Sequence, residues 1–348
     1  MLKTISVEEE DKHLLEAAFY SNPFSFSYSS LSRLLISPNI FYKEYVLKQK
    51  EIRTEKHLLE GTLIHFLLLE GSNFADHFIV TPESLPSDNS VLVANEIYKI
   101  YKVRVKEDPT LIDVDLIYFF KEIDEILQVM NLHQSIKDAP KRLSKIIEPK
   151  TEAYFQYLKV KDTKQIIDST MLDKASLAVQ KIKANEGICE LLGMTQEPDG
   201  NTFGVYNEIE LNTELKDLPF GIKGILDNLT IDVVKKQINI NDFKTSGKPL
   251  SEFPDSVEYW KYWLQAVVYV KLATEFFKNV INDDPAWNIT FRFIVFDKYD
   301  QLYAYPVTPT TLRLWEERFD KTIVSALYHY ENKEFELPYD FAVGNIKL

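Results

Sequence analysis

The sequence predicts a mixed α/β fold in which helices pack around a small sheet. Apolar residues recur at strand spacing in one part of the chain and at helical spacing in others. Segments of both kinds alternate toward the C-terminus, which is typical of layered α/β domains. The strand-like segments lie at about 203–245, 289–297 and 302–307, and the helix-like segments at about 170–192, 256–278 and 309–332.

The N-terminal part predicts shorter elements. Residues 1–55 have the pattern of short helices and turns, with a capped helix over 29–36 and a break at Pro38. A strong helix is expected over about 55–71, and a short strand over 78–80. Residues 82–92 contain two prolines and several serines, and predict a loop.

The middle of the chain predicts an insertion. Residues from about 90 to 150 are charged and carry apolar positions at helical spacing, and 152–168 is expected to form a hairpin. We therefore expect residues 1–348 to form one domain. Its core is expected at about 27–80 and 152–340, with a helical insertion or subdomain at 85–150.

Composition excludes several classes of protein. Hydrophobic residues make up 45% of the chain and aromatic residues 13%, which is enough for a sizeable core. The 10 glycines include no glycine-rich nucleotide-binding loop. Cys189 is the single cysteine, so a disulfide framework, a zinc site of several cysteines and a four-cysteine iron–sulfur cluster are excluded.

The formal net charge of −13 is unfavourable for phosphate binding, which depends largely on Lys and Arg. Binding of nucleic acid would therefore require a locally basic groove and positive charge from bound metal ions. No apolar run approaches the length of a membrane span, and residues 1–10 do not resemble a signal peptide. We expect a cytoplasmic protein with no membrane partner.

Two acids and a lysine near residue 240 are the most informative group. Asp227 and Asp242 lie on two strand-like segments that are expected to pair, and Lys244 follows Asp242 by two positions. Residues two apart on a strand point to the same face, so a carboxylate and an ammonium are expected side by side. Two carboxylates can hold a hard divalent cation, and the lysine can position or deprotonate a water. A solvated hairpin with a cross-strand salt bridge is the simpler alternative for the same residues.

Three further features lie along the chain. His65 sits in an apolar stretch of the helix at 55–71 and is either a metal ligand or a satisfied core histidine. Gln265 and Tyr269 are four apart and share a helix face, as a polar pair at a site or as part of a half-buried helix. Glu208 and Glu210 share a strand face, and either could add a carboxylate to the metal or remain an exposed acid.

In order, these motifs are Gly-Thr-x-x-His, Glu, Gly-x-x-Asp, Asp-x-Lys-Thr and Gln-x-x-x-Tyr. This arrangement resembles the PD-(D/E)XK nuclease superfamily, in its RecB-like branch, and is most similar to phage-type RecE (exonuclease VIII) nucleases. The resemblance covers roughly residues 27–71 and 165–340. It implies a restriction-endonuclease-like core, a small mixed sheet flanked by helices.

By resemblance, His65, Asp227 and Asp242 would bind the metal, together with the carbonyl oxygen of Phe243. Lys244 would orient the attacking water and stabilise developing charge. Gln265 and Tyr269 would support Lys244 or contact DNA.

Glu208 would be the additional acid of the metal site, with Glu210 as the alternative. The expected cofactor is Mg²⁺, for which Mn²⁺ can substitute, with no iron–sulfur cluster.

The resemblance implies a metal-dependent DNA exonuclease that acts on linear duplex ends during recombination or DNA processing, in a bacterial or phage-infected cell. Ring-shaped homo-oligomers and a single-strand annealing protein as partner belong to the same expectation. A single-strand-specific or endonucleolytic DNase is one alternative. A non-cleaving DNA-binding module that retains the fold is another.

Overall fold

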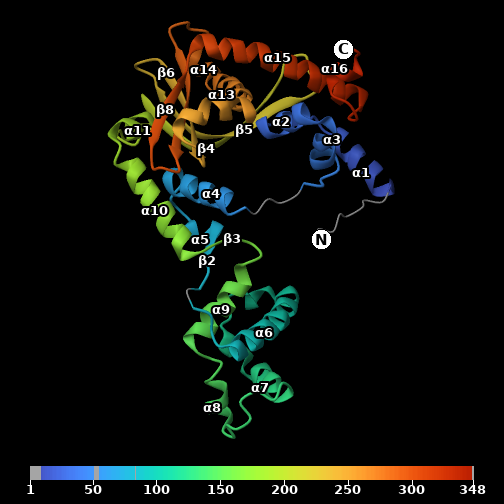
Figure 1. The fold of residues 1–348 in the computed structure, drawn as a ribbon, viewed down its shortest axis with the longest axis vertical. Coiled ribbons are helices and arrows are strands. Elements are labelled where there is room, and N and C mark those ends of the chain that lie inside the picture. The colour runs from blue at the N-terminus through green and yellow to red at the C-terminus, as the bar shows by residue number, and fades with distance from the viewer. Residues whose placement is uncertain (1–8, 51–54, 83, 347–348) are drawn as a thin grey trace. The chain divides into compact units, whose positions relative to one another are not determined.

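The computed structural model describes residues 9–50, 55–82 and 84–346. The expectation about a signal peptide rests on residues 1–10, of which 1–8 lie outside the described residues. The chain divides into two compact units, coloured along the chain in Figure 1. The first comprises Met1–Gly61, Leu68–Glu70 and Ala178–Leu348, and the second comprises Thr62–Leu67 and Gly71–Leu177.

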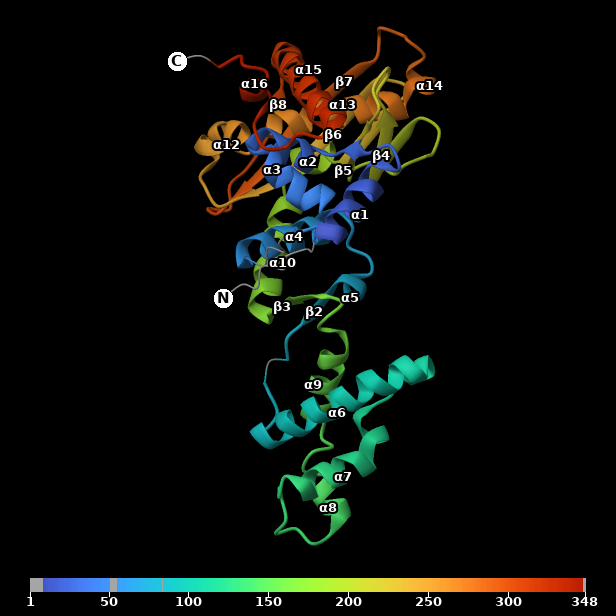
Figure 2. The ribbon, with the colours of Figure 1, turned by 90° about the vertical axis from the view of Figure 1, so that its right-hand side faces the viewer.

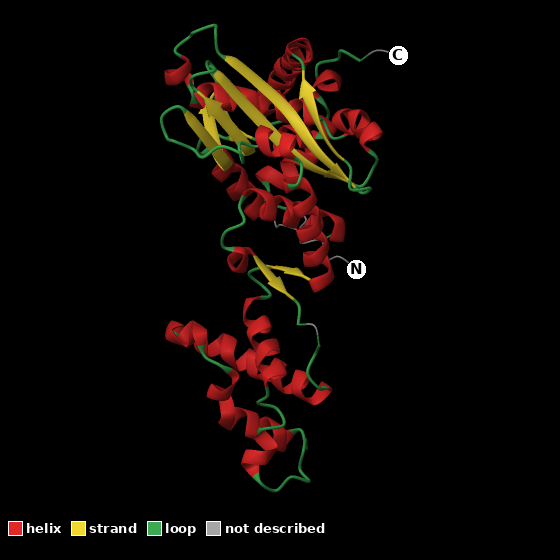
Figure 3. Ribbon diagram, turned by 90° about the vertical axis from the view of Figure 1, so that its left-hand side faces the viewer, coloured by secondary structure: helices red, strands yellow, loops and turns green. Residues whose placement is uncertain are grey.

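The first unit is a mixed α/β structure built on a central sheet (Figure 3). Its strands are β1 (Ser25–Phe26), β4 (Phe203–Glu214), β5 (Gly221–Asp232), β6 (Gln237–Ser246), β7 (Asn288–Asp297) and β8 (Leu302–Val307). The order is β1-β5-β6-β7-β8, and β4 also pairs with β5. The β4–β5, β5–β6 and β7–β8 pairs are antiparallel, whereas β1–β5 and β6–β7 are parallel. The sequence-based prediction of a mixed sheet with flanking helices is thus confirmed.

Strand β5 has an opening along one of its edges. Its first residues, Gly221 and Ile222, pair with β1, and its residues from Asn228 to Asp232 pair with β6. The expected pairing of the two acid-bearing strands is therefore present, but it starts at Asn228, one residue after Asp227. At Asp227 and before it along the chain, β5 is not paired with β6 and the two strands separate.

The helices of the first unit cover the sheet. They are α1 (Glu9–Tyr20), α2 (Tyr28–Ile36), α3 (Pro38–Phe41), α11 (Glu186–Leu191), α12 (Phe253–Tyr259), α13 (Tyr262–Phe276), α14 (Lys278–Ile281), α15 (Pro309–Asn332) and α16 (Tyr339–Ala342), with a π-helical turn at Tyr42–Val46 and a 3-10 turn at Leu250–Glu252. Helix α13 packs on β4, β5, β6 and β7, and α15 packs on α13. Helices α4 (Lys56–Leu69) and α10 (Ser169–Lys183) contain residues of both units.

The C-terminal predictions are confirmed at β7, β8 and α15, whose bounds differ from the predicted ones by at most one residue. The prediction of one helix over 256–278 is wrong. Two helices, α12 and α13, meet at Lys261, which has a left-handed backbone with φ of 59°. Apolar periodicity continues across this break, so the sequence pattern does not reveal the single left-handed residue that interrupts the helix.

The second unit contains a two-stranded parallel sheet and a helical bundle (Figure 1). Its elements are α5 (Phe74–His77), β2 (Phe78–Val80), α6 (Asp88–Glu107), α7 (Phe120–Val129), α8 (Ala139–Leu143), α9 (Pro149–Val160) and β3 (Gln165–Ile167), with 3-10 turns at Pro109–Asp113 and Leu116–Phe119. The predicted helical character of residues 90–150 is confirmed.

The predicted hairpin at 152–168 is wrong. Residues 149–160 form α9, which has Pro149 in its first turn and buries Thr151, Phe155 and Leu158. These positions share one helix face, and Phe155 packs edge-on against Tyr101 and Phe119. The aromatic residues that favour a strand locally are held in a helix by this core.

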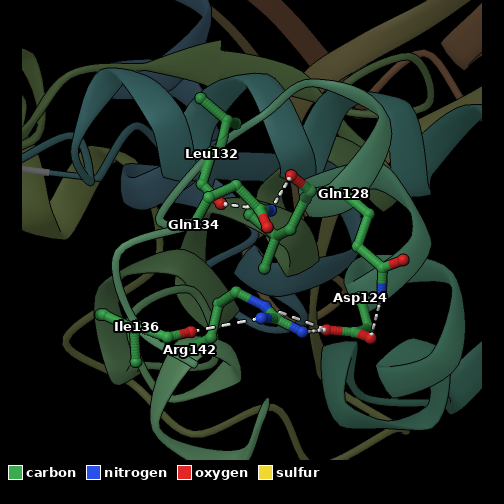
Figure 4. Close-up of polar contacts among 7 residues, drawn as sticks. Asp124, Gln128, Leu132, Gln134, Ile136 and Arg142 are labelled. Atoms are coloured by element: carbon green, nitrogen blue, oxygen red, sulfur yellow. Dashed lines mark hydrogen bonds and ion pairs between the residues drawn. The ribbon is translucent and has the colours of Figure 1, made fainter. Parts of the chain in front are cut away.

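An ion pair between Arg142 and Asp124 connects α8 and α7 of this unit (Figure 4). The Nε and Nη2 atoms of Arg142 lie 3.2 and 2.6 Å from Oδ1 of Asp124, and Nη1 donates to the carbonyl oxygen of Ile136 at 3.2 Å. The second oxygen of Asp124 accepts from Gln128 at 2.7 Å. The guanidinium therefore joins α7, α8 and the loop between them.

Across the described ranges, every helix is too short or too polar to cross a lipid bilayer.

Candidate active site

The separation of β5 from β6 brings a carboxylate to the backbone of the neighbouring strand. Asp227 lies at the first position beyond the paired segment, and its Oδ2 accepts a hydrogen bond from the backbone N–H of Phe243 at 2.8 Å. Asp227 is only 9% exposed and Asp242 is fully buried. The two predicted acids therefore lie on adjacent strands at the point where the strands part.

Asp242 and Lys244 form a close ion pair. The Nζ of Lys244 lies 2.5 Å from Oδ2 of Asp242, and the lysine side chain is 18% exposed. The predicted shared strand face is thus observed. The same Nζ lies 5.1 Å from the centre of the Tyr262 ring, so an aromatic face covers the cation on another side.

Burial by itself would lower the pKa of Lys244, but the negative charges of Asp242 and Asp227 outweigh burial and raise this pKa above its ordinary value. The lysine therefore carries a positive charge throughout the physiological pH range. In this state it can orient a water and stabilise negative charge, but it has no free electron pair to accept a proton.

Helix α13 provides a polar brace for the acid. Nε2 of Gln265 donates to Oδ1 of Asp242 at 2.8 Å and lies 3.0 Å from the hydroxyl of Tyr269. Gln265 thus contacts Asp242 rather than Lys244, which sharpens the expected supporting role. Burial and the charges of Asp242 and Asp227 raise the pKa of Tyr269, so its hydroxyl remains protonated.

The glycine of the Gly-x-x-Asp motif has a packing function. A Cβ atom at Gly224 would lie 2.8 Å from Cε1 of Tyr269 and 3.2 Å from Leu272. Only a residue without a side chain lets α13 approach β5 this closely. The glycine therefore places the Tyr269 and Gln265 side chains against the acids.

Glu208 lies at an irregular point of β4. Its φ of +49° is left-handed, which is rare for a non-glycine residue inside a strand. The core-packing residues Tyr206 and Ile209 on β4 are three apart, as are Leu226 and Leu229 on β5. In a regular strand an odd separation places side chains on opposite faces, so the pleat changes phase at Glu208 and at the facing Asp227. Such local strain is typical of functional sites.

Glu208 and Asp227 form part of a group with metal-ligand geometry. His65, Glu208 and Asp227 each offer a ligand atom, and these atoms lie within 4.8 Å of one another. Two carboxylates at this separation repel by a few kcal/mol at an effective dielectric constant of about 20. A divalent cation between the two carboxylates would turn this net repulsion into a net attraction.

The other predicted residues lie as follows. Glu210 is exposed, and Asp242 is outside the three-residue group although it lies next to Asp227 in the adjacent strand. Phe243 follows Asp242 in the chain, and its backbone N–H donates to the carboxylate of Asp227. The assignment of metal-binding and catalytic roles to all these residues stays a prediction.

Sequence reasoning missed a ladder of asparagines across the sheet. Asn228 donates to Oδ1 of Asn207 at 2.8 Å, and Asn241 donates to Oδ1 of Asn228 at 2.6 Å. Arg292 continues the ladder onto β7 by donating to Asn241 at 3.0 Å. Because these residues face each other in the strand register, their amides link four neighbouring strands.

The ladder also holds the C-terminal end of α11. Nδ2 of Asn228 donates to the carbonyl oxygen of Leu192, and Nδ2 of Asn241 donates to that of Leu191. Asn228 and Asn241 are the chain neighbours of Asp227 and Asp242, so the ladder fixes the strands at the point where the acids emerge. The mirrored pairs Asp-Asn and Asn-Asp are the signal in the sequence that could have indicated it.

The chain matches no protein-family model and no curated protein. Among solved structures, it is similar to a crystal structure from Eubacterium rectale described as "Putative exonuclease". The two are 10% identical, with a TM-score of 0.42 over 99% of this chain and 95% of the other. A likeness of this degree carries no argument about activity.

Proposed function

We propose that this protein is a metal-dependent DNA exonuclease with a PD-(D/E)XK core. The observation that carries the proposal is the concentration of two buried carboxylates and one half-buried carboxylate where β5 and β6 part. Glu208 and Asp227 face each other across β4 and β5, while Asp242 lies on β6. Lys244 is the positively charged side chain whose pKa is raised by the charges of Asp242 and Asp227. Negative charge therefore exceeds positive charge at the site.

The donor set fits a magnesium or manganese ion. Mg²⁺ prefers carboxylate oxygens and retains several waters, and an imidazole is accepted by Mn²⁺. We propose that Glu208, Asp227 and Asp242 hold the ion with His65 and the carbonyl oxygen of Phe243. Bound at this place, the ion would polarise a phosphodiester and lower the pKa of a water.

The residues of the chain then have separate tasks. The Lys244 ammonium would bind the attacking water or a phosphate oxygen and offset the negative charge that develops there. Gln265 would hold the Asp242 carboxylate in place through the hydrogen bond from Nε2. Water would attack the phosphorus, and the bond to the leaving sugar oxygen would break.

The substrate that we propose is the end of a linear DNA duplex. The acidic chain is unfavourable for binding along a long exposed duplex, because non-specific affinity depends on Lys and Arg. A ring of subunits with a basic channel would resolve this, and an annealing protein that takes up the product strand is the expected partner. We further propose that residues 85–150 are a helical insertion or subdomain within a single nuclease domain.

The test is digestion of end-labelled linear duplex by purified protein with Mg²⁺, alongside a closed circular duplex of the same sequence. We expect loss of the linear substrate with release of nucleotides from one end, and an intact circle. Asp242→Asn should remove the activity while the unfolding temperature stays near that of the wild type.

Three other results would redirect the proposal. Cleavage of the circle indicates an endonuclease, and cleavage of single strands alone indicates a single-strand-specific DNase. Intact linear, circular and single-stranded DNA with both Mg²⁺ and Mn²⁺ would leave only a non-cleaving binding module.

A further inference from the structure

We propose that Tyr259 and Trp260 form a stacking platform for an unpaired nucleotide next to the active site. This inference rests on the proposed function and adds a contact to the substrate that the catalytic group does not supply. The two residues lie at the end of α12 (Figure 2), where 72% of Tyr259 and 50% of Trp260 are exposed. Their rings meet edge to face, with centroids 4.7 Å apart and planes at 89°.

The platform is exposed in its side chains but fixed in its backbone. The N–H of Trp260 donates to the carbonyl of Ser256 at 2.9 Å, and the hydroxyl of Tyr28 donates to the carbonyl of Trp260 at 2.6 Å. Lys261, which follows, adopts a left-handed conformation that ends α12 and starts α13. A strained turn held by a side chain from α2 is thus used to present two large aromatic rings to solvent.

A chain of contacts connects the turn to the catalytic lysine. The ring of Tyr28 lies 6.3 Å from the ring of Tyr262, and the Tyr262 ring lies 5.1 Å from Nζ of Lys244. The turn therefore belongs to the same corner of the first unit as the proposed site. We infer that a strand whose phosphate lies at Lys244 extends along this corner and stacks one of its bases on the platform.

The chemistry of the turn favours a nucleic acid over an apolar protein partner. Lys261 adds a cation to the two rings, and the nearby acid Glu258 is neutralised by Arg318, which donates to its oxygens at 2.9 and 2.8 Å. Exposed aromatic rings are typical of surfaces that bind single strands, where stacking tolerates any base. The expected ligand is an unpaired DNA segment at a frayed or resected end.

The experiment compares wild-type protein with the double variant Tyr259→Ala/Trp260→Ala. Binding of a fluorescein-labelled oligothymidylate is measured by anisotropy in Ca²⁺, without turnover. We expect binding to weaken by about tenfold or more, because loss of stacking on one base corresponds to roughly 5- to 150-fold. Phe276→Ala is the matched control, because Phe276 is 46% exposed at the far end of α13. It should leave affinity unchanged.

Two further readouts separate stacking from a loss of structure. Trp260→Phe should keep most of the affinity but lose the quenching of tryptophan fluorescence that accompanies binding. In the cleavage assay, the double variant should raise KM on a substrate with an overhang and change kcat by less than about twofold.

If the double variant binds the oligonucleotide with wild-type affinity, the proposed stacking platform is refuted, even if the protein is an active nuclease. Weaker self-association of the double variant, with unchanged affinity for the oligonucleotide, would assign the turn to a protein interface instead. An inactive wild-type enzyme that still binds oligothymidylate through Trp260 would refute the proposed hydrolysis and keep the platform. The two proposals can therefore fail separately.

Discussion

Each unit contains a short ion pair with little exposure, but the two pairs differ in their surroundings. Arg142 and Asp124 in the second unit lie 2.6 Å apart, with side chains 10% and 25% exposed. Asp242 and Lys244 in the first unit lie 2.5 Å apart, with side chains 0% and 18% exposed. Distance and burial alone do not distinguish them.

The difference lies in the balance of charge. The Arg142–Asp124 pair is neutral, and its remaining donors and acceptors are bonded to Ile136 and Gln128. The Asp242–Lys244 pair has a further buried carboxylate on the neighbouring strand and a glutamate opposite that carboxylate. Removing one partner of a balanced pair leaves an uncompensated charge in the fold, whereas an unbalanced group of charges costs folding free energy and is suited to an additional cation.

The largest expected effect is on catalysis. Lys244→Ala should reduce cleavage by at least about 10²-fold, because it removes the cation next to the reacting group. Metal binding should persist, since the carboxylates remain. The measurement is single-turnover cleavage together with calorimetric titration of Mn²⁺.

Lys248→Ala is the matched control for this variant, because Lys248 lies four residues along the chain and is 60% exposed. It should retain wild-type activity. Cleavage at the wild-type rate by Lys244→Ala would refute the catalytic role proposed for Lys244.

For the Arg142–Asp124 pair we expect a variant to lose stability without a direct effect on catalysis. Arg142→Met leaves Asp124 and the Ile136 carbonyl without their donor, and should lower the free energy of unfolding of the second unit by about 1–3 kcal/mol. Hydrogen exchange resolved by segment would locate the loss at α7 and α8.

Lys141→Ala provides the comparison for Arg142→Met, because Lys141 is 80% exposed and lies 4.0 Å from Asp138. Its effect should be within about 0.5 kcal/mol. Equal protection in both variants would show that the Arg142 pair contributes nothing to the bundle.

Removal of one amide from the asparagine ladder should have an intermediate effect. Asn228→Ala leaves the Leu192 carbonyl without its side-chain donor and the Asn241 amide without one of its acceptors, both at buried hydrogen bonds, at a cost of about 1–3 kcal/mol. Because Asn228 adjoins Asp227, metal affinity should fall as well. Denaturant unfolding with and without Mn²⁺ would separate the two effects.

The smallest expected effect has the opposite sign. Glu208→Gly should stabilise the metal-free protein by about 1 kcal/mol, since glycine adopts the left-handed backbone of this position without strain. The same change should weaken metal binding. A destabilised variant would indicate that the glutamate side chain supports the fold instead of burdening it.

The elements that the sequence predicted well are those with a regular period. Strands β7 and β8 and helix α15 follow strand or helix spacing without interruption. The errors at α9 and at Lys261 arose where tertiary contacts or a single backbone conformation override the local pattern. The shared face of Asp242 and Lys244 followed from a spacing of two residues on one strand, and that of Gln265 and Tyr269 from a spacing of four residues on one helix.

The remainder of the site depends on register between strands, which a single sequence does not contain. The asparagine ladder arises because Asn207, Asn228, Asn241 and Arg292 face one another across four strands. The preference for Glu208 over Glu210 as a neighbour of Asp227 depends on a change of pleat phase. Neither feature leaves a periodic trace in the chain.

The central claim is that the carboxylates around Asp227 form a cation site. The most direct test is thermal unfolding of wild type and Asp227→Asn, each with and without Mn²⁺. The account predicts that Mn²⁺ raises the unfolding temperature of the wild type and leaves that of Asp227→Asn unchanged. It also predicts that the metal-free variant is at least as stable as the metal-free wild type. An equal rise with Mn²⁺ in both proteins, or no rise in the wild type, would contradict the claim.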